Sequence, residues 1–135
     1  MKTPILILFL FGLISCQDSQ LEADQALQEK VENEIRNGSK VNFAELTDFE
    51  WDQMITLGPY SQVDKIADSL HLDLRNIRSN GISHSDYYTL VVFLNNKKSV
   101  RIIEPPKRFD RTGVVIPKRE STFKVNKEGI LSRTE

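Results

Sequence analysis

The sequence has only one cysteine, Cys16, in 135 residues. A lone cysteine forms no disulfide within its own chain, and it excludes any Cys-x-x-Cys pair of the kind that binds zinc or carries redox chemistry. The folded part must therefore be held together by a hydrophobic core alone. Residues 16–135 provide 120 residues, which is enough for one such core and too few for two.

Long hydrophobic runs are also scarce. The most apolar stretch, residues 5–14, has 10 residues and would span about 15 Å as a helix, whereas the hydrocarbon core of a bilayer is ~30 Å thick. With Lys2 before it and the small residue Ser15 after it, the stretch instead has the three parts of a secretory signal. We therefore expect residues 1–15 to be a signal peptide.

Several short motifs are missing as well. The chain has no Gly-x-Ser-x-Gly elbow, no Walker loop and no Gly-x-Gly-x-x-Gly turn, which are the usual marks of hydrolytic and nucleotide-binding sites. The formal charge of −1 and the export signal disfavour nucleic acid as a partner. We expect no cofactor, and we predict that the protein is not an enzyme.

The sole cysteine stands where that signal ends, because Leu13-Ile14-Ser15 leads directly into Cys16. This pattern resembles the lipobox of bacterial lipoproteins, which implies that the sulfur of Cys16 carries fatty acyl chains and that Cys16 is the mature amino terminus. The expectation is a bacterial protein held by lipid on a membrane outside the cytoplasm. Gln17 in place of aspartate after the cysteine favours the outer membrane if the cell has two. The alternative is an ordinary signal peptide with an incidental cysteine.

The first part of the mature chain, residues 16–40, is expected to hold the lipid anchor, a polar tether and a helix. Ala, Leu, Glu and Gln dominate Leu21–Arg36 and favour a helix, which Asn37-Gly38 ends. Its apolar residues recur every four positions: Leu27, Val31 and Ile35. This stripe is narrow, so we predict a loosely packed stalk. Alternatively, the stripe docks a helix of a partner.

Residues 41–135 are expected to form a single α+β domain, a small antiparallel sheet of about five strands with one packed helix. Alternation predicts a strand over residues 49–57, with Phe49, Trp51, Gln53, Ile55 and Leu57 on one face. Ser61 is predicted to cap the helix that follows. Two hairpins then pair residues 88–94 with 100–104 and residues 122–125 with 130–132.

Three stretches of this part resemble a group of small bacterial lipoproteins and exported proteins with no assigned function. The stretches are Phe49-Glu50-Trp51-Asp52 with Gly58-Pro59-Tyr60-Ser61, Leu90-Val91-Val92-Phe93-Leu94 with Arg101-Ile102-Ile103, and Pro117-Lys118-Arg119-Glu120 with Phe123-Lys124-Val125. The resemblance implies an exported single domain. It brings no catalytic residue with it.

Charge is divided unevenly along the chain. Residues 17–70 have 12 acidic and 4 basic residues, whereas residues 71–135 have 7 acidic and 13 basic residues. The candidate binding surface consists of eight of these cations: Lys97, Lys98, Arg101, Lys107, Arg108, Arg111, Lys118 and Arg119. Such a surface suits anionic headgroups, an anionic envelope polymer or an acidic envelope protein. We therefore predict a non-catalytic binding or accessory domain, although a solvated face without a partner remains the alternative.

A second hypothesis concerns two histidine–carboxylate pairs, His71-x-Asp73 and His84-x-Asp86. On a strand, residues two apart point the same way, so each pair has the composition of half a metal site. Both pairs lie in polar, turn-rich segments, and nothing in the sequence brings them together. We predict no metal site, and keep a small metal-dependent or hydrolytic enzyme as the alternative.

Overall fold

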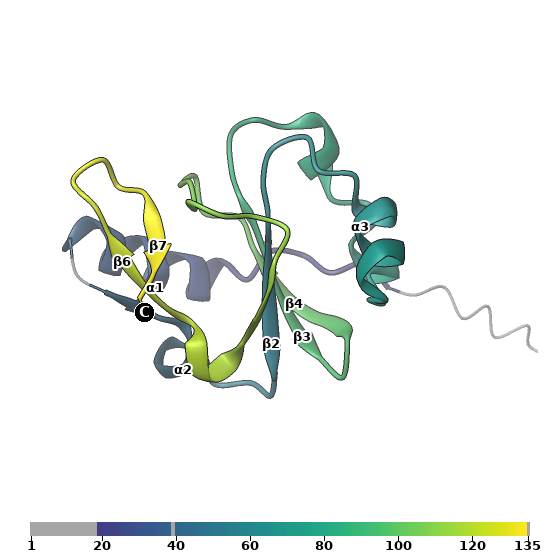
Figure 1. The fold of residues 1–135 in the computed structure, drawn as a ribbon, viewed down its shortest axis with the longest axis horizontal. Coiled ribbons are helices and arrows are strands. Elements are labelled where there is room, and N and C mark those ends of the chain that lie inside the picture. The colour runs from purple at the N-terminus through teal and green to yellow at the C-terminus, as the bar shows by residue number, and fades with distance from the viewer. Residues whose placement is uncertain (1–18, 39, 135) are drawn as a thin grey trace, which may run out of the picture.

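The computed structural model describes residues 19–38 and 40–134. The predicted signal peptide and Cys16 lie outside these residues. Within the described residues, seven strands form two antiparallel sheets, and helices cover them in an α+β arrangement (Figure 1). The predicted fold class is therefore confirmed, but the strands divide between a four-stranded and a three-stranded sheet.

The four-stranded sheet forms the middle of the molecule. Its strands are β2 (Gln53–Leu57), β3 (Leu90–Asn95), β4 (Lys98–Ile103) and β5 (Val115–Pro117), in the order β4-β3-β2-β5. The β3–β4 hairpin confirms the prediction from residues 88–104, and its two turn residues, Asn96 and Lys97, have φ values of 50° and 65°. Positive φ at both central positions matches the right-handed twist of the flanking strands.

The three-stranded sheet joins the short strand after α1 to the last two strands of the described chain. It consists of β1 (Val41–Asn42), β6 (Thr122–Val125) and β7 (Leu131–Arg133), in the order β1-β6-β7. The β6–β7 hairpin was predicted. Two short strands were not predicted, and they account for the difference from the expected number of about five. Strand β5 pairs with β2 in the larger sheet, and β1 pairs with β6.

Helix α1 (Gln25–Arg36) packs against the rest of the molecule, so the predicted stalk is wrong. Its stripe of Leu27, Val31 and Ile35 is buried in the core formed with β1 and the short helix α2 (Phe43–Leu46). A narrow stripe is sufficient here because the opposite side of the helix faces solvent. The stripe is therefore not available to dock a partner helix. The predicted stop is confirmed, with Gly38 at a φ of 65°.

The four-stranded sheet separates two hydrophobic clusters. One contains the buried phenylalanines and Trp51 and is closed by α1 and the three-stranded sheet. The other is built from Ile, Leu and Val, and is closed by α3 (Val63–Leu70) and by 3-10 turns η1 (Arg75–Ile77) and η2 (Gly81–His84). Strand β3 contributes to both, as Phe93 enters the first cluster and Leu94 the second.

The predicted strand over residues 49–57 is wrong in its first half. Strand β2 begins at Gln53, and Trp51 lies in the aromatic cluster while Ile55 lies in the aliphatic one. The chain bends at Phe49 and Asp52, so strict alternation does not continue through this segment. Instead, the Trp51 indole N–H donates to Thr47 Oγ1 at 2.8 Å, and the ring centroid lies 4.9 Å from that of Phe93.

The predicted cap of α3 is also displaced. The helix begins at Val63, Gln62 occupies the N-cap position, and no side chain caps it. Ser61 Oγ donates instead to the Gly58 carbonyl at 2.6 Å. Tyr60 has a φ of 62°, so the chain turns sharply before the helix and brings Ser61 back to Gly58.

Among residues 19–38 and 40–134, none of the helices has both the length and the apolar character needed to cross a membrane.

Candidate functional site: an arginine-lined cleft

A polar cleft of about 520 Å³ lies beside the three-stranded sheet. Three segments line it: the loop before β5, the 3-10 turn η3 (Lys118–Glu120) and the ends of β6 and β7. The lining residues are Asp110, Arg111, Arg119, Glu120, Thr122, Arg133 and Thr134. All are charged or carry a hydroxyl, so the cleft suits a charged and hydrated ligand.

Hydrogen bonds to the sheets fix the loop that carries Arg111. Thr56 Oγ1 on β2 donates to the Arg111 carbonyl at 3.1 Å, and the Gly113 amide donates to the Thr56 carbonyl at 2.7 Å. On the other side, the Asp110 amide donates to the carbonyl of Leu131 on β7 at 2.8 Å. The Arg111 backbone is therefore held between the two sheets.

The turn η3 is fixed in the same way. The Lys118 amide donates to the Asp52 carbonyl at 2.9 Å, and Ser121 Oγ donates back to the Lys118 carbonyl at 2.6 Å. The Phe43 amide then donates to the Ser121 carbonyl at 3.1 Å. Because hydrogen bonds hold both ends of η3, the backbone position of Arg119 in the cleft wall is fixed.

The cleft carries a small excess of positive charge, with three arginines against the carboxylates of Asp110 and Glu120. Arg133 forms an ion pair with Glu120 at 3.4 Å, whereas Arg111 and Arg119 form no ion pair with any residue that the structure describes. Guanidinium groups bind carboxylates and phosphates through two parallel N–H bonds. The hydroxyls of Thr122 and Thr134 add further polar groups to the lining. The arrangement can therefore bind a carboxylate or a phosphate.

Two of the eight predicted surface cations are engaged within the fold. Arg101 forms an ion pair with Asp24 at 2.8 Å and stacks over the Phe49 ring at 4.3 Å. Lys118 lies over the Trp51 ring, with its Nζ 5.1 Å from the centroid. Cations placed over aromatic faces are attracted to them, so both side chains support the packing around the aromatic cluster.

Asp24 also caps helix α1. Its Oδ1 accepts the Leu27 amide at 3.0 Å while its Oδ2 accepts Arg101. Partial burial acts to raise the pKa of Asp24, but the hydrogen bonds from Leu27 and Arg101 and the charges of Arg101 and Lys30 hold it below its ordinary value. Arg101 is therefore part of the helix-capping arrangement.

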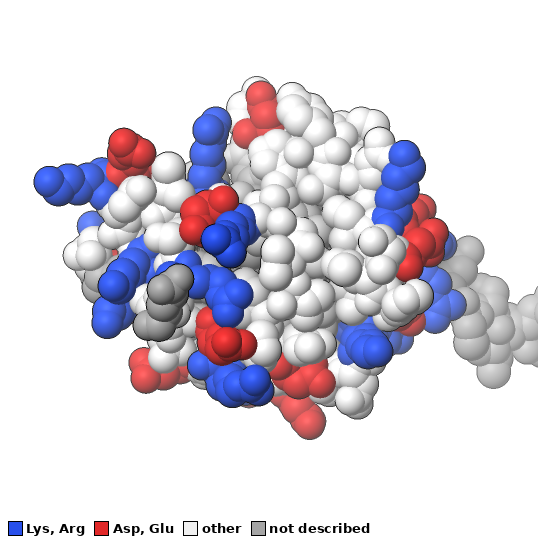
Figure 2. Space-filling view, viewed as in Figure 1, with Lys and Arg blue, Asp and Glu red and all other residues white. Residues whose placement is uncertain are grey.

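The other predicted cations lie in separate places. Arg111 and Arg119 line the cleft, Lys107 and Arg108 line a small cavity beside Tyr87, and Lys97 and Lys98 belong to the β3–β4 hairpin. Figure 2 shows basic side chains interleaved with acidic ones, beside a broad area free of both. The structure therefore brings together only part of the predicted set, at the cleft.

The histidine–carboxylate pairs lie apart from the cleft. His71 is exposed at the end of α3, while Asp73 lines a cavity between α3 and η1. His84 is exposed at the end of η2, and Asp86 lines the small cavity beside Tyr87. Within the part of the chain that the structure describes, no three His, Cys, Asp or Glu residues are grouped to hold a metal ion.

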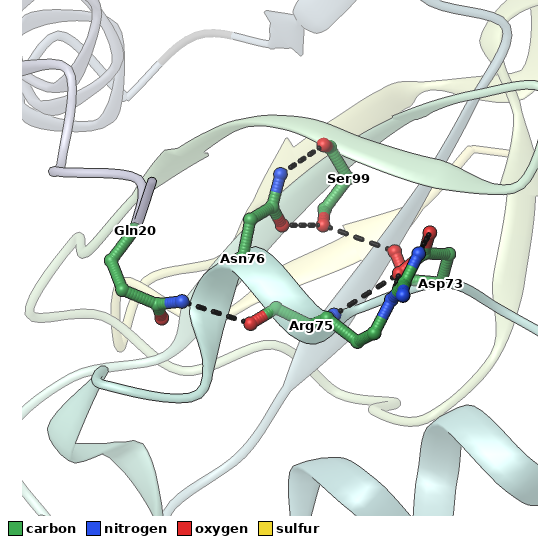
Figure 3. A network of polar contacts seen from close by, with 5 residues as sticks. All are labelled: Gln20, Asp73, Arg75, Asn76 and Ser99. Carbon is green, nitrogen blue, oxygen red and sulfur yellow. Dashed lines mark hydrogen bonds and ion pairs between the residues drawn. The ribbon is translucent and has the colours of Figure 1, made fainter. Parts of the chain in front are cut away.

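Asp73 is instead bound to Arg75. Arg75 donates from its Nε to Asp73 Oδ1 at 3.0 Å and from an Nη to Oδ2 at 2.9 Å (Figure 3). These hydrogen bonds lower the pKa of Asp73 to about 2. The carboxylate is thus ionised and occupied at neutral pH.

Sequence reasoning missed the part of the cleft that the β6–β7 hairpin supplies. Arg133 lies opposite Phe123, at the end of the hairpin that begins with Thr122. The predicted hairpin ended at Ser132. Extending its pairing by one residue would have placed Arg133 beside the basic segment that ends at Arg119.

Comparison of the chain with protein-family models, with curated proteins and with solved structures found no match.

Proposed function

We propose that the protein is a lipid-anchored domain of the bacterial cell envelope that binds an anionic polymer and catalyses no reaction. The lipobox-like end of the signal supports the anchor, with Cys16 as the lipidated residue. The observation that carries the binding proposal is the pair of guanidinium groups, Arg111 and Arg119, that line a cleft without an acidic partner among the described residues.

The composition of the cleft favours a polymer over a protein. Protein interfaces usually bury aromatic or aliphatic side chains at their centre, whereas every residue that lines this cleft is charged or carries a hydroxyl. An anionic polymer offers repeated carboxylates or phosphates, and each can be held by a guanidinium fork. It also keeps much of its hydration, which suits an open polar cleft.

The proposal is tested by measuring how the purified, lipidated protein in detergent binds polyphosphate and poly-glutamate. The test variant is Arg111→Gln/Arg119→Gln. The matched control is Lys124→Gln/Lys127→Gln, which removes the same charge from exposed positions outside the cleft. Loss of two charge-assisted hydrogen bonds should weaken binding at least about tenfold. The control should change it little, and the stronger of the two probes identifies the anionic group.

Equal losses in the two variants would show that binding follows net charge and would contradict the role of the cleft. A crosslinked pull-down from native membranes, with Cys16→Ser as the control, tests the competing partner. Capture of a protein partner in stoichiometric amount through the cleft would contradict polymer binding. It would indicate instead that the protein is an accessory subunit of a complex.

A further inference from the structure

The chain is fastened to the folded domain very close to Cys16. Gln20 Nε2 donates to the Arg75 carbonyl at 3.0 Å, and Gln20 Oε1 accepts the Ser79 amide at 2.8 Å. The next residue is held too, as the Leu21 amide donates to the Asn76 carbonyl at 2.7 Å. Figure 3 shows Gln20 reaching from the N-terminal segment to η1. Gln20 and Leu21 are therefore fixed to the folded domain.

This attachment sets how far the domain can stand from its anchor. Four peptide units separate Cys16 from Gln20, and a fully extended chain of that length spans at most about 14 Å. The headgroup layer on each side of a bilayer is itself ~5–8 Å thick. If Cys16 is lipidated, Gln20 lies within about 14 Å of it, so the surface around Gln20 lies at the headgroups or only a few ångströms above them.

The β3–β4 turn belongs to the same surface. The Asp73 amide donates to the Lys97 carbonyl at 2.8 Å, and the Ser99 amide donates to the Asp73 carbonyl at 3.1 Å. Asn76 Nδ2 donates to the Ser99 carbonyl at 2.8 Å, and its side-chain oxygen accepts Ser99 Oγ. The turn is thus bound to η1, beside the attachment of Gln20.

The charges on this surface suit anionic headgroups. Lys97 and Lys98 are exposed and form no ion pair with any residue in the described ranges. Of the nearby acids, Asp73 is paired with Arg75 and Asp64 with Arg78. Glu22 and Asp68 are exposed. Asp52 lies at the turn itself, where its Oδ2 accepts the Asn96 amide at 3.2 Å, so the two lysines give the turn a small net positive charge.

We propose that the face formed by Gln20, η1 and the β3–β4 turn lies on the lipid surface that holds Cys16, with Lys97 and Lys98 against anionic headgroups. This inference rests on the anchor of the proposed function. It also sets the orientation of the domain. Strands β6 and β7 lie toward the other end of the long axis from α3 (Figure 1). The arginine cleft is lined in part by the ends of these strands, so this orientation would place it toward the end of the domain away from the membrane.

The test places a fluorescent label on the lipidated protein in vesicles of phosphatidylglycerol that contain a headgroup quencher. Cys16 is the only native cysteine, so the label goes on Ser79→Cys beside Gln20 or on Lys127→Cys in the β6–β7 turn. We expect strong quenching at position 79 and little at position 127. Equal or reversed quenching would overturn the proposed orientation.

The lysines are tested in the Ser79→Cys background. Lys97→Gln/Lys98→Gln should reduce quenching in phosphatidylglycerol vesicles, because each lysine at an anionic surface changes the contact equilibrium about fivefold. The control Lys124→Gln/Lys30→Gln alters two exposed lysines elsewhere and should leave it unchanged. Unchanged quenching in the first variant would overturn the role assigned to Lys97 and Lys98.

Flotation of the same vesicles measures whether the protein is attached to the membrane, independently of its orientation there. Protein that floats with the vesicles but is not quenched at position 79 keeps the anchor and loses the orientation. A chain that floats no better than its Cys16→Ser variant has no lipid anchor, and both proposals then fail.

Discussion

The two faces of the four-stranded sheet are covered by different kinds of side chain. On one face, Phe93 makes edge-to-face contacts with Phe43, Phe49 and Trp51, at centroid distances of 6.0, 5.3 and 4.9 Å. On the other face, aliphatic side chains pack beneath α3 and the 3-10 turns. Edge-to-face pairs require a particular geometry and aliphatic contacts do not, so the aromatic face specifies how α1 and the three-stranded sheet dock.

The helices that cover the two faces also differ: α1 on the aromatic face is longer and better capped than α3 on the aliphatic face. Helix α1 has 12 residues, a side-chain cap from Asp24 and a stripe of fully packed residues. Helix α3 has 8 residues, no side-chain cap and one buried residue, Val63. A short uncapped helix has little stability of its own. We therefore expect disruption of the α1 side to unfold the domain, and disruption of the α3 side to be tolerated better.

The largest difference should come from placing a charge in each helix. Val31 is fully buried and Ile66 only partly buried. Val31→Asp should cost at least several kcal/mol, roughly the whole stability of a small domain, whereas Ile66→Asp should leave a folded protein. Circular dichroism in urea measures both, with the exposed Lys30→Asp on α1 as the control. A folded Val31→Asp protein would show that α1 is dispensable.

The next comparison uses neighbours on β3 that face opposite ways. Phe93 and Leu94 are both fully buried. Removing a buried phenylalanine typically costs about 3–5 kcal/mol and removing a buried leucine about 2–5 kcal/mol. We expect Phe93→Ala to have the larger effect because three ring contacts are lost with it. A larger loss for Leu94→Ala in the same urea titration would reverse the proposed ranking of the faces.

Local features, such as the turns and the apolar stripe of a helix, were predicted from the sequence better than the tertiary contacts that these elements make. The spacing of Leu27, Val31 and Ile35 gave the correct stripe of α1, but a stripe does not reveal which surface covers it. Strand β5 was missed because it has only three residues, Val115–Pro117, and these show no alternation to detect. Trp51 was assigned to the wrong side because its chain segment leaves the extended conformation, which the local pattern does not show.

The cleft was predictable only in part for a related reason. Arg111 and Arg119 were named from their local sequence as members of a basic surface. Arg111 and Arg119 line the same cleft as Arg133. This depends on the register of the β6–β7 hairpin and on the contacts of two loops with β2 and α2. Those contacts join residues far apart in the chain, and no short pattern encodes them.

A smaller loss of stability is expected from removing the hydrogen bond between Asn76 and Ser99 on the aliphatic side. The buried Asn76 side chain donates to the Ser99 carbonyl, and its loss leaves that buried acceptor without this donor. Asn76→Ala should cost about 1–3 kcal/mol. It should also speed amide exchange at Leu21 and Ser79, which hold the N-terminal segment. Unchanged exchange at both amides would show that Gln20 alone fixes this segment.

The smallest effect concerns pH. The Asp73 side chain is 32% exposed, and the hydrogen bonds from Arg75 hold its pKa at about 2, against an ordinary value of 3.8. Because the folded pKa is the lower one, this ion pair stabilises the protein above pH 4, and the contribution disappears as the pH falls from about 4 to 2. Carbon-detected NMR titration should give the low value, and Arg75→Gln should raise it. Equal values in the two proteins would contradict the assigned cause.

The pairing of β1 with β6 has a consequence for how the protein is made. Val41 lies opposite Phe123, a residue much later in the chain. The aromatic core therefore cannot close until almost the whole chain has emerged, and structures with such distant contacts fold slowly. For the exported, lipid-anchored protein that we propose, this delay would be useful. It would keep the polypeptide able to pass through a translocation channel until almost all of it has crossed, and the domain would then fold beside its anchor.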